Sequence, residues 1–236
     1  MKRLVICGLA RNCEASVAEN LERITKCAYF AVKENLKIID FENDSTDNTR
    51  RVLQMYEKEN PQVELYTEDQ VDKRFPVRVE RLSYCREKLR KIAVNSEGES
   101  REVFLVVIDL DSSIGQSLQE DTFWIALQRL EEHGLNGIFP VSQPYYYDVM
   151  ALRCDGWCKV DTNLAVREGR RRLGTYGSIL FNRTAYQKCF NNFIPKTIIP
   201  VESAFNGFGV YRMAAIQDHP YTCWDEGSSV PVCEHV

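Results

Sequence analysis

The sequence has little of what marks membrane, nucleic-acid-binding and disulfide-rich proteins. No apolar run approaches the ~20 residues that a membrane-spanning helix needs. The 30 lysines and arginines are outnumbered by 34 aspartates and glutamates, so the basic face that binds nucleic acid is not expected. The nine cysteines are odd in number, scattered and without a Cys-x-x-Cys pair. They favour free thiols in a reducing compartment, the cytoplasm, with a secreted domain holding four disulfides as the alternative.

Several catalytic signatures are missing as well. No Gly-x-Gly-x-x-Gly follows the first apolar segment and no Gly-x-x-x-x-Gly-Lys-Ser/Thr occurs, which disfavours dinucleotide oxidoreductases and P-loop enzymes. No Gly-x-Ser-x-Gly is present, and the only histidines are His133, His219 and His235. Serine hydrolase chemistry is therefore disfavoured too.

The most informative stretch is residues 103–112. Residues 103–108 are continuously apolar and mostly β-branched, which predicts a strand buried on both faces. The strand runs into Asp109 and Asp111, whose spacing places both carboxylates on one side of an extended chain. Like charges at the mouth of a buried strand need neutralising, and oxygen ligands suit Mn²⁺ or Mg²⁺. The alternative is an ordinary acidic turn.

Strand-like and helix-like segments alternate through the first half of the chain. Strands are expected at residues 4–8, 37–41, 63–66, 103–108 and 137–142, and helices at 13–34, 46–59, 79–94 and 118–133. Residues 69–77 are charged and irregular, and helical periodicity is weak after residue 145. The pattern predicts an α/β fold with a parallel sheet covered by helices. We expect one domain over residues 1–236, with a nucleotide-binding half (1–115) and a half that shapes the acceptor and donor-sugar pocket (116–236).

Ligands of open parallel sheets bind beyond the carboxyl ends of the strands. Those ends carry three polar groups of residues: 10–12 (Ala-Arg-Asn), 42–44 (Glu-Asn-Asp) and 109–111 (Asp-Leu-Asp). Together they would hold a nucleoside diphosphate and its cation. The alternatives are a helix cap for Asp44 and a solvated loop cation for Arg11.

Six motifs, taken in order, resemble glycosyltransferases of the GT-A fold, in particular fungal capsule-type and family-2-like sugar transferases. They are residues 6–12 (ICGLARN), 42–49 (ENDSTDNT), the Asp109–Asp111 DxD motif, 147–153 (YDVMALR), 202–212 (ESAFNGFGVYR) and 233–235 (CEH). The resemblance covers nearly the whole chain. It implies a GT-A sheet, mostly parallel and flanked by helices, with a smaller antiparallel part on the acceptor side.

The resemblance also implies roles for individual residues. Donor contacts would come from Ala10, Arg11, Asn43, Asp44, Arg81, Arg86, Asp109, Leu110, Asn206 and Gly207. The cation, Mn²⁺ or Mg²⁺, would be held by Asp109, Asp111 and His235, and the acceptor by Asp148, Arg153 and Trp157. Asp111, Arg86 and Glu202 would be catalytic, and if the enzyme inverts the base would be Glu202, Asp225 or Glu226. A solvated helix face is the alternative for the arginines, and a core position for Trp157.

The activity implied is metal-dependent transfer of a hexose from a nucleotide sugar to a hydroxyl of a glycan or glycoprotein. UDP-hexose is the favoured donor and GDP-mannose the second, with retention at the anomeric carbon. The alternatives are a sugar-phosphate nucleotidyltransferase and a non-catalytic nucleotide- or carbohydrate-binding module. Golgi members of the family carry a membrane anchor that we do not find in this sequence. We therefore expect a soluble enzyme or a part of a larger multidomain protein.

Overall fold

The computed structural model describes residues 2–97, 102–111, 118–142, 146–155, 158, 161–190, 198–224 and 231–235, without the side chains of residues 162, 163, 178 and 180–190. The chain divides into two compact units. Unit 1 consists of Met1–Ile138 and Gly207–Pro220, and unit 2 of Phe139–Asn206 and Tyr221–Val236. The division into functional halves at residue 115 stays a prediction.

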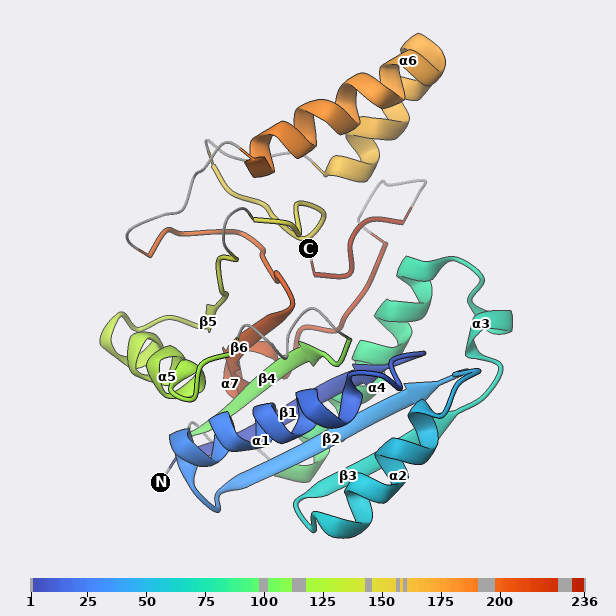
Figure 1. Cartoon of the computed structure of the whole chain (residues 1–236). Coiled ribbons are helices and arrows are strands. Elements are labelled where there is room, and N and C mark those ends of the chain that lie inside the picture. The colour runs from blue at the N-terminus through green and yellow to red at the C-terminus, as the bar shows by residue number, and fades with distance from the viewer. Residues whose placement is uncertain are drawn as a thin grey trace. The chain divides into compact units, whose positions relative to one another are not determined.

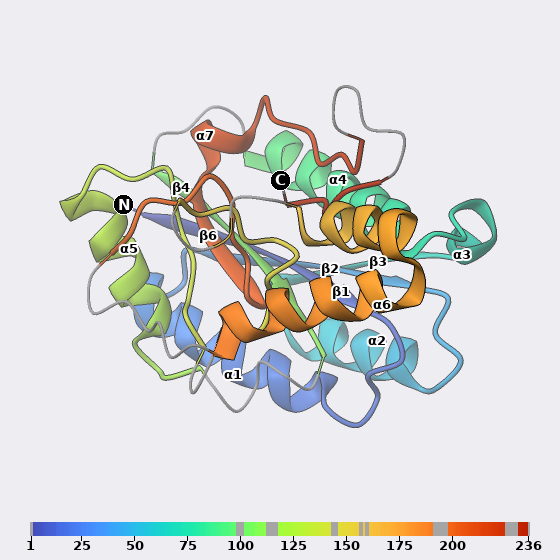
Figure 2. The same ribbon diagram turned by 90° about the horizontal axis from the view of Figure 1, so that it is seen from above.

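Unit 1 is a layered α/β structure. Its elements are β1 (Arg3–Ala10), α1 (Val17–Val32), β2 (Leu36–Asn43), α2 (Thr49–Glu59), β3 (Val63–Glu68), α3 (Val71–Arg74), α4 (Arg78–Glu97), β4 (Val103–Asp109), α5 (Thr122–Glu132), β5 (Gly137–Ile138), β6 (Phe208–Arg212) and α7 (Met213–Ile216). The sheet has six strands in the order β3-β2-β1-β4-β6-β5. Helices α1, α2 and α5 cover one face and α4 the other (Figures 1 and 2). The expected α/β class, a mostly parallel sheet flanked by helices, is confirmed.

Apolar strands explain why the centre of the sheet forms. β1 pairs in parallel with β2 and with β4, placing Ile6 beside both Ile38 and Val106. Residues 103–108 of β4 are all buried, as expected for a strand covered on both faces. Because β1, β2 and β4 run parallel, their carboxyl ends meet at one edge of the sheet. The polar residues that follow these strands are thereby brought together.

The antiparallel edge of the sheet differs from expectation. β6 pairs with β4 from Ile108↔Phe208 to Phe104↔Arg212, and the sequence did not predict this strand. The strand expected over residues 137–142 covers only Gly137–Ile138, the two residues that pair with β6. Pro140 lacks a backbone N–H, so it would weaken a continued ladder. The stretch expected to be irregular at residues 69–77 contains the single helical turn α3.

Unit 2 is built around a small apolar cluster and the 29-residue helix α6 (Thr162–Phe190). The cluster comprises Tyr146, Val149, Leu152, Cys154, Cys158 and Ala204. α6 bends at Gly174, whose φ of 62° and ψ of −148° are outside the helical region. Figures 1 and 2 show two helical arms folded back on each other. This helix was missed in the sequence, since its arms pack on each other and present no single apolar stripe.

Gly8 is the one glycine of β1, and its lack of a side chain is needed. A Cβ there would lie 2.5 Å from Asp40 Oδ1 and 2.7 Å from Leu110 Cδ1, both in the core. We expect Gly8→Ala to lower the free energy of unfolding by about 1–3 kcal/mol, the usual cost of overpacking. Urea denaturation measures this. Gly134→Ala is the comparison, because a Cβ added at Gly134 would have no atom within 4 Å. Its cost would come from the backbone alone, since its φ of 61° is strained for alanine. Equal or smaller loss in Gly8→Ala would contradict close packing at Gly8.

The part of the chain that the structure describes contains no helix long and apolar enough to cross a membrane. The eight cysteines with described positions are all buried and free of disulfides.

Candidate functional site

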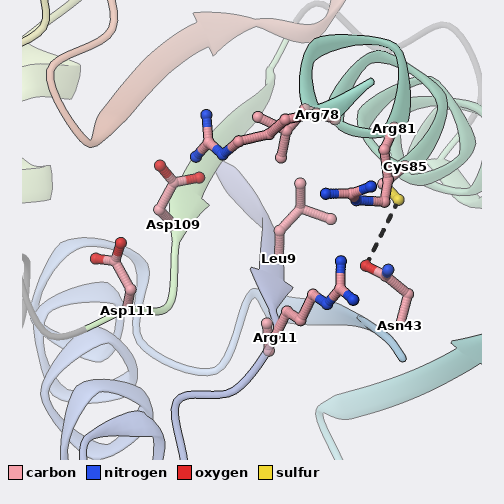
Figure 3. Close-up of a pocket in the computed structure, with 10 residues that line it drawn as sticks. Leu9, Arg11, Asn43, Arg78, Arg81, Cys85, Asp109 and Asp111 are labelled. Carbon is pink, nitrogen blue, oxygen red and sulfur yellow. Dashed lines mark hydrogen bonds between the residues drawn. The ribbon is translucent and has the colours of Figure 1, made fainter. Parts of the chain in front are cut away.

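A pocket of about 220 Å³ opens in unit 1 at the carboxyl ends of β1 and β4, beside the start of α4. It is lined by Leu9, Ala10, Arg11, Asn43, Arg78, Arg81, Leu82, Cys85, Asp109 and Asp111. Figure 3 shows Asp109 and Asp111 on one side and Arg11 and Asn43 on the other, with Leu9 between them. The structure thus brings six of the residues predicted from sequence into one pocket: Ala10, Arg11, Asn43, Arg81, Asp109 and Asp111.

Asp109 is held in place by a buried cation. Arg86 on α4 is 3% exposed and donates a hydrogen bond to Asp109 Oδ1 at 2.8 Å. The Asp109 amide also donates to the carbonyl of Gly207 at 3.1 Å, at the start of β6. Arg86 is therefore no solvated surface cation, and it does not line the pocket. Its geometry supports a positioning role for Asp109, and direct contact with a diphosphate stays a prediction.

The rest of the Asp-Leu-Asp segment is fixed through its backbone. Leu110 is 1% exposed and packs in the core, while its neighbour Asp111 is exposed. The side-chain amide of Asn20, on α1, donates to the carbonyl of Leu110 at 3.1 Å and to that of Asp111 at 2.5 Å. The Leu110 amide donates to the carbonyl of Leu9 at 3.0 Å. The segment is thus tied to both α1 and β1, so Asp111 is held at a defined position beside Asp109.

We expect Asn20→Ala to weaken Mn²⁺ binding about tenfold, because groups that orient metal ligands contribute factors of this size. Mn²⁺ titration followed by electron paramagnetic resonance measures the affinity. Asn35→Ala is the matched control, since the Asn35 side chain donates to the carbonyl of Lys2 at 2.7 Å, outside the pocket. Equal Mn²⁺ affinities of Asn20→Ala and Asn35→Ala would mean that Asn20 stabilises the fold without orienting the metal ligands.

One face of α4 supplies the cationic side of the pocket. Arg78, Arg81, Leu82 and Cys85 recur at positions i, i+3, i+4 and i+7, which places them on one side of the helix. Arg78, Leu82 and Cys85 were not predicted as site residues, although this spacing could have identified them. The Arg81 guanidinium donates to the carbonyl of Phe75 at 3.0 Å, and Arg11 pairs with Asp72 at 3.2 Å. Burial raises the pKa of the Cys85 thiol to about 12, so it is neutral in the pocket.

Asn43 is the last residue of β2 and Asp44 follows it, and the two side chains have different roles. Asn43 lines the pocket, and its side-chain amide donates to Asp44 Oδ2 at 3.0 Å. The Asp44 carboxylate accepts from the amides of Gln70 at 2.6 Å and Asp72 at 2.9 Å, which caps α3. Although partial burial opposes it, these bonds and nearby Arg11 lower the pKa of Asp44. The helix cap expected as the alternative role of Asp44 is therefore present. It caps α3, however, and not α2, the next helix in the sequence.

Glu42 was expected to offer acceptors to a nucleoside, and the structure uses it internally. Its carboxylate accepts from the amide of Ser45 at 2.9 Å and is paired with Arg50. Glu42 is fully buried. Of residues 42–44, at the carboxyl end of β2, Asn43 is therefore the one that lines the pocket.

Two loops next to the pocket are joined by mutual hydrogen bonds. These are the β1–α1 loop (residues 11–16) and the β2–α2 loop (residues 44–48). Ser45, Asp47 and Thr49 side chains accept from the amides of Asn12 (3.1 Å), Glu14 (3.1 Å) and Cys13 (2.8 Å). In return, the side chains of Asn12 and Glu14 accept from the amides of Thr46 (2.8 Å) and Asn48 (3.0 Å). The polar residues of motif 42–49 that follow Asp44 therefore serve to bond the two loops to each other.

The remaining predicted residues belong to unit 2, apart from Gly207. Asp148 accepts from the amides of Asn206 at 3.1 Å and Ala151 at 3.4 Å. Asn206 is buried, with a φ of 56°, and Glu202 is exposed. Arg153 is buried, pairs with Asp161 and donates to the carbonyl of Leu152 at 2.7 Å. These contacts support a structural role for Arg153, and its acceptor role stays a prediction. Trp157, Asp225 and Glu226 lie outside the described residues.

The residues of the pocket fit a divalent cation in chemistry. Carboxylate oxygens such as those of Asp109 and Asp111 are the ligands that Mg²⁺ and Mn²⁺ prefer. Within the described ranges, no three His, Cys, Asp or Glu side chains are grouped as a metal site. The predicted third ligand, His235, belongs to unit 2, where its ring stacks on Phe205 with centroids 3.9 Å apart. Its role as a ligand stays a prediction.

Comparison with known proteins finds partial structural matches only. No protein-family model matches the sequence, and no curated protein matches it. S. aureus TarS (1–349) aligns at 18% identity and a TM-score of 0.41, over 59% of this chain and 36% of that one. Mannosyltransferase PcManGT from Pyrobaculum calidifontis, in complex with GDP-Man and Mn²⁺, aligns at 17% identity and a TM-score of 0.43, over 60% and 36%. Glucosyl-3-phosphoglycerate synthase from Mycobacterium tuberculosis, with Mn²⁺, UDP and phosphoglyceric acid, aligns at 12% identity and a TM-score of 0.42, over 90% and 56%.

The matched parts thus span 36% to 56% of the length of these structures. At identities of 12% to 18%, the function of this chain has to be inferred from its own pocket.

Proposed function

We propose that this chain is a metal-dependent glycosyltransferase whose unit 1 pocket binds the nucleoside diphosphate of a sugar donor. The observation that carries the proposal is the composition of that pocket. Two carboxylates, Asp109 and Asp111, and three guanidinium groups, Arg11, Arg78 and Arg81, line it together. A diphosphate with one divalent cation needs both kinds of group: carboxylates for the cation, and arginines for the phosphate oxygens that remain charged.

Each set of residues would have a separate task. Arg11, Arg78 and Arg81 would bind the phosphate oxygens and hold the diphosphate as it leaves the sugar. Asn43, with one amide group facing the pocket, would contact the nucleoside. Asp109 and Asp111 would hold Mn²⁺ or Mg²⁺, with His235 as the proposed third ligand. The bound cation would supply Lewis-acid stabilisation of the leaving diphosphate.

We take UDP-hexose as the first donor to test and GDP-mannose as the second. The acceptor would be a hydroxyl of a glycan or glycoprotein, with Asp148, Arg153 and Trp157 as candidates to line its site. We propose transfer with retention, which requires no carboxylate base on the acceptor. If the enzyme inverts, exposed Glu202 is the candidate base.

The two alternative functions make different demands on the same pocket. A nucleotidyltransferase needs a glycine-rich loop after the first strand, but residues 11–16 contain no glycine. They are instead bonded to the β2–α2 loop through side chains. A non-catalytic module would bind nucleotide without turnover. Product analysis separates the three functions, because they yield free nucleoside diphosphate, pyrophosphate and no product, respectively.

The first test is a thermal-shift screen of UDP, GDP, CDP and their sugars, each with Mn²⁺ and with EDTA. A ligand at a hundred times its dissociation constant should add about 2.7 kcal/mol of stability. We expect a shift with one diphosphate that disappears in EDTA. The absence of a thermal shift with any nucleotide would overturn the proposal. A thermal shift combined with no diphosphate in the product analysis would instead support the non-catalytic binding module.

A further inference from the structure

The bend of α6 exposes a basic and apolar surface in unit 2. We name it the α6 tip and define it as Arg167, Arg170, Arg171, Arg172, Leu173, Tyr176 and Ile179. The four arginines are all classed as exposed, and the apolar side chains are 56% (Leu173), 70% (Tyr176) and 59% (Ile179) exposed. Large apolar side chains with this exposure are normally scattered over a protein surface. Three of them close together beside arginines indicate an interaction site.

The backbone of the bend fixes this grouping. Gly174 makes the bend with a φ of 62°. A Cβ on Gly177 would lie 2.0 Å from the carbonyl oxygen of Gly169, so only glycine allows the two arms to approach this closely. Residues 171–176 are exposed throughout. Leu173 and Tyr176 therefore lie exposed at the bend. Figure 1 shows this bend as the turn between the two helical arms of α6.

The charge of the α6 tip is opposite to that of the chain. Residues 167–172 contain four arginines and one glutamate, a net charge of +3, while the whole chain has a net charge of −4. Glu168 accepts from Arg171 and Arg172 at 2.7 Å, which orients both guanidinium groups. A concentrated positive charge in an acidic protein favours an anionic partner.

We propose that the α6 tip docks on an anionic phospholipid surface. Arginines bind the phosphate groups of lipids, and leucine, isoleucine and tyrosine insert at the boundary between headgroups and acyl chains. A soluble polyanion would use the arginines but would leave Leu173, Tyr176 and Ile179 in water. The apolar side chains therefore favour a membrane over a polyanion. This inference does not depend on the glycosyltransferase proposal.

The test is co-sedimentation of the full chain with vesicles of phosphatidylcholine alone and of phosphatidylcholine mixed with phosphatidylserine. We expect binding only to the mixed vesicles, weakened by salt. The triple variant Arg170→Gln, Arg171→Gln, Arg172→Gln should bind about a hundredfold more weakly, as three arginines near such a surface predict. Leu173→Ser with Tyr176→Ser should also lose binding, because the apolar insertion is removed.

Control variants carry comparable substitutions elsewhere on the surface. Arg23→Gln with Lys26→Gln removes one half-buried and one exposed cation from α1, and Tyr29→Ser with Phe30→Ser removes apolar side chains that are 47% and 52% exposed. Both should bind vesicles like the unchanged protein. Binding that survives the serine changes but is competed by heparin would identify a polyanion site and overturn the proposal. The proposal would also be overturned if the α1 controls lost vesicle binding to the same extent. It would likewise be overturned if the protein formed a dimer that only the α6 substitutions dissociated.

Discussion

Replacing Asp111 with alanine should abolish the cation-dependent binding of a nucleoside diphosphate and lower turnover about a thousandfold, since a catalytic cation contributes several kcal/mol. Asp111 lines the pocket and is exposed, so its removal creates no cavity in the core. Isothermal titration with the best diphosphate, with and without Mn²⁺, measures the binding. We expect the affinity without metal to be unchanged, since the arginines of the pocket remain.

Asp111 is a better probe than Asp109. Removing Asp109 would also take a carboxylate partner from the buried guanidinium of Arg86, which would lower the stability of the fold as well as remove a proposed metal ligand. Asp218→Ala is the control, an exposed aspartate of unit 1 outside the pocket. An Asp111→Ala variant that keeps its Mn²⁺-dependent binding would remove the metal role from this residue, and with it the central part of the proposed function.

Replacing Asp40 with asparagine should stabilise the protein, and the gain should grow with pH. Asp40 lies on β2 and is 1% exposed. Neither of its carboxylate oxygens has a hydrogen-bond partner within the described part of the chain. Burial, with a smaller contribution from Glu57, raises its pKa to about 8. A carboxyl group in this position is neutral in the folded protein at pH 7 but ionised in the unfolded chain.

The sign of the pH dependence follows from these two states. Below about pH 4 the carboxyl group is protonated in both states, so Asp40 and asparagine should give similar stability. Between about pH 4 and pH 8 only the folded protein keeps the proton, and stability falls by about 1.4 kcal/mol for each pH unit. Above the folded pKa of about 8 the loss is constant. Urea denaturation of both proteins from pH 4 to pH 9 measures the difference.

Asp218→Asn makes the same chemical change on the surface and should show no such trend. A constant difference between Asp40→Asn and the unchanged protein at every pH would mean that Asp40 is ionised in the folded state. The position is structurally sensitive, because the Asp40 carboxyl lies beside Gly8 and in the same core as Leu110.

The parallel part of the fold was predictable because strands buried on both faces appear in the sequence as apolar runs. β1 and β4 carry such a run, β2 has shorter apolar stretches interrupted by Lys37 and Asp40, and all three end beside the polar residues that meet at the pocket. β6 has only five residues, and its partners lie about a hundred positions earlier in β4. A pairing at that distance leaves no local pattern in either strand, so the family resemblance implied an antiparallel part but the position of β6 could not be predicted from the sequence pattern.

The same distinction applies to the pocket. Asp109, Asp111 and Arg11 were predictable because they follow strands directly. Asn20 was not, because its side chain bonds backbone carbonyls that lie 90 and 91 residues away and could accept from any donor. The contact between Arg86 and Asp109 was not predictable for a related reason. Sequence placed it on the helix facing the site, but only packing shows that it is buried behind the lining residues.

The paired loops beside the pocket have a consequence for the kinetics of ligand binding. The β1–α1 and β2–α2 loops hold each other through side-chain bonds to exposed amides, including those of Asn12, Glu14 and Asn48. Fixing the backbone of a mobile loop residue costs about 1–2 kcal/mol of conformational entropy. Here that entropy is lost when the chain folds, before any ligand arrives. A ligand entering on this side of the pocket meets a preformed wall, and its association rate need not wait for these loops to close.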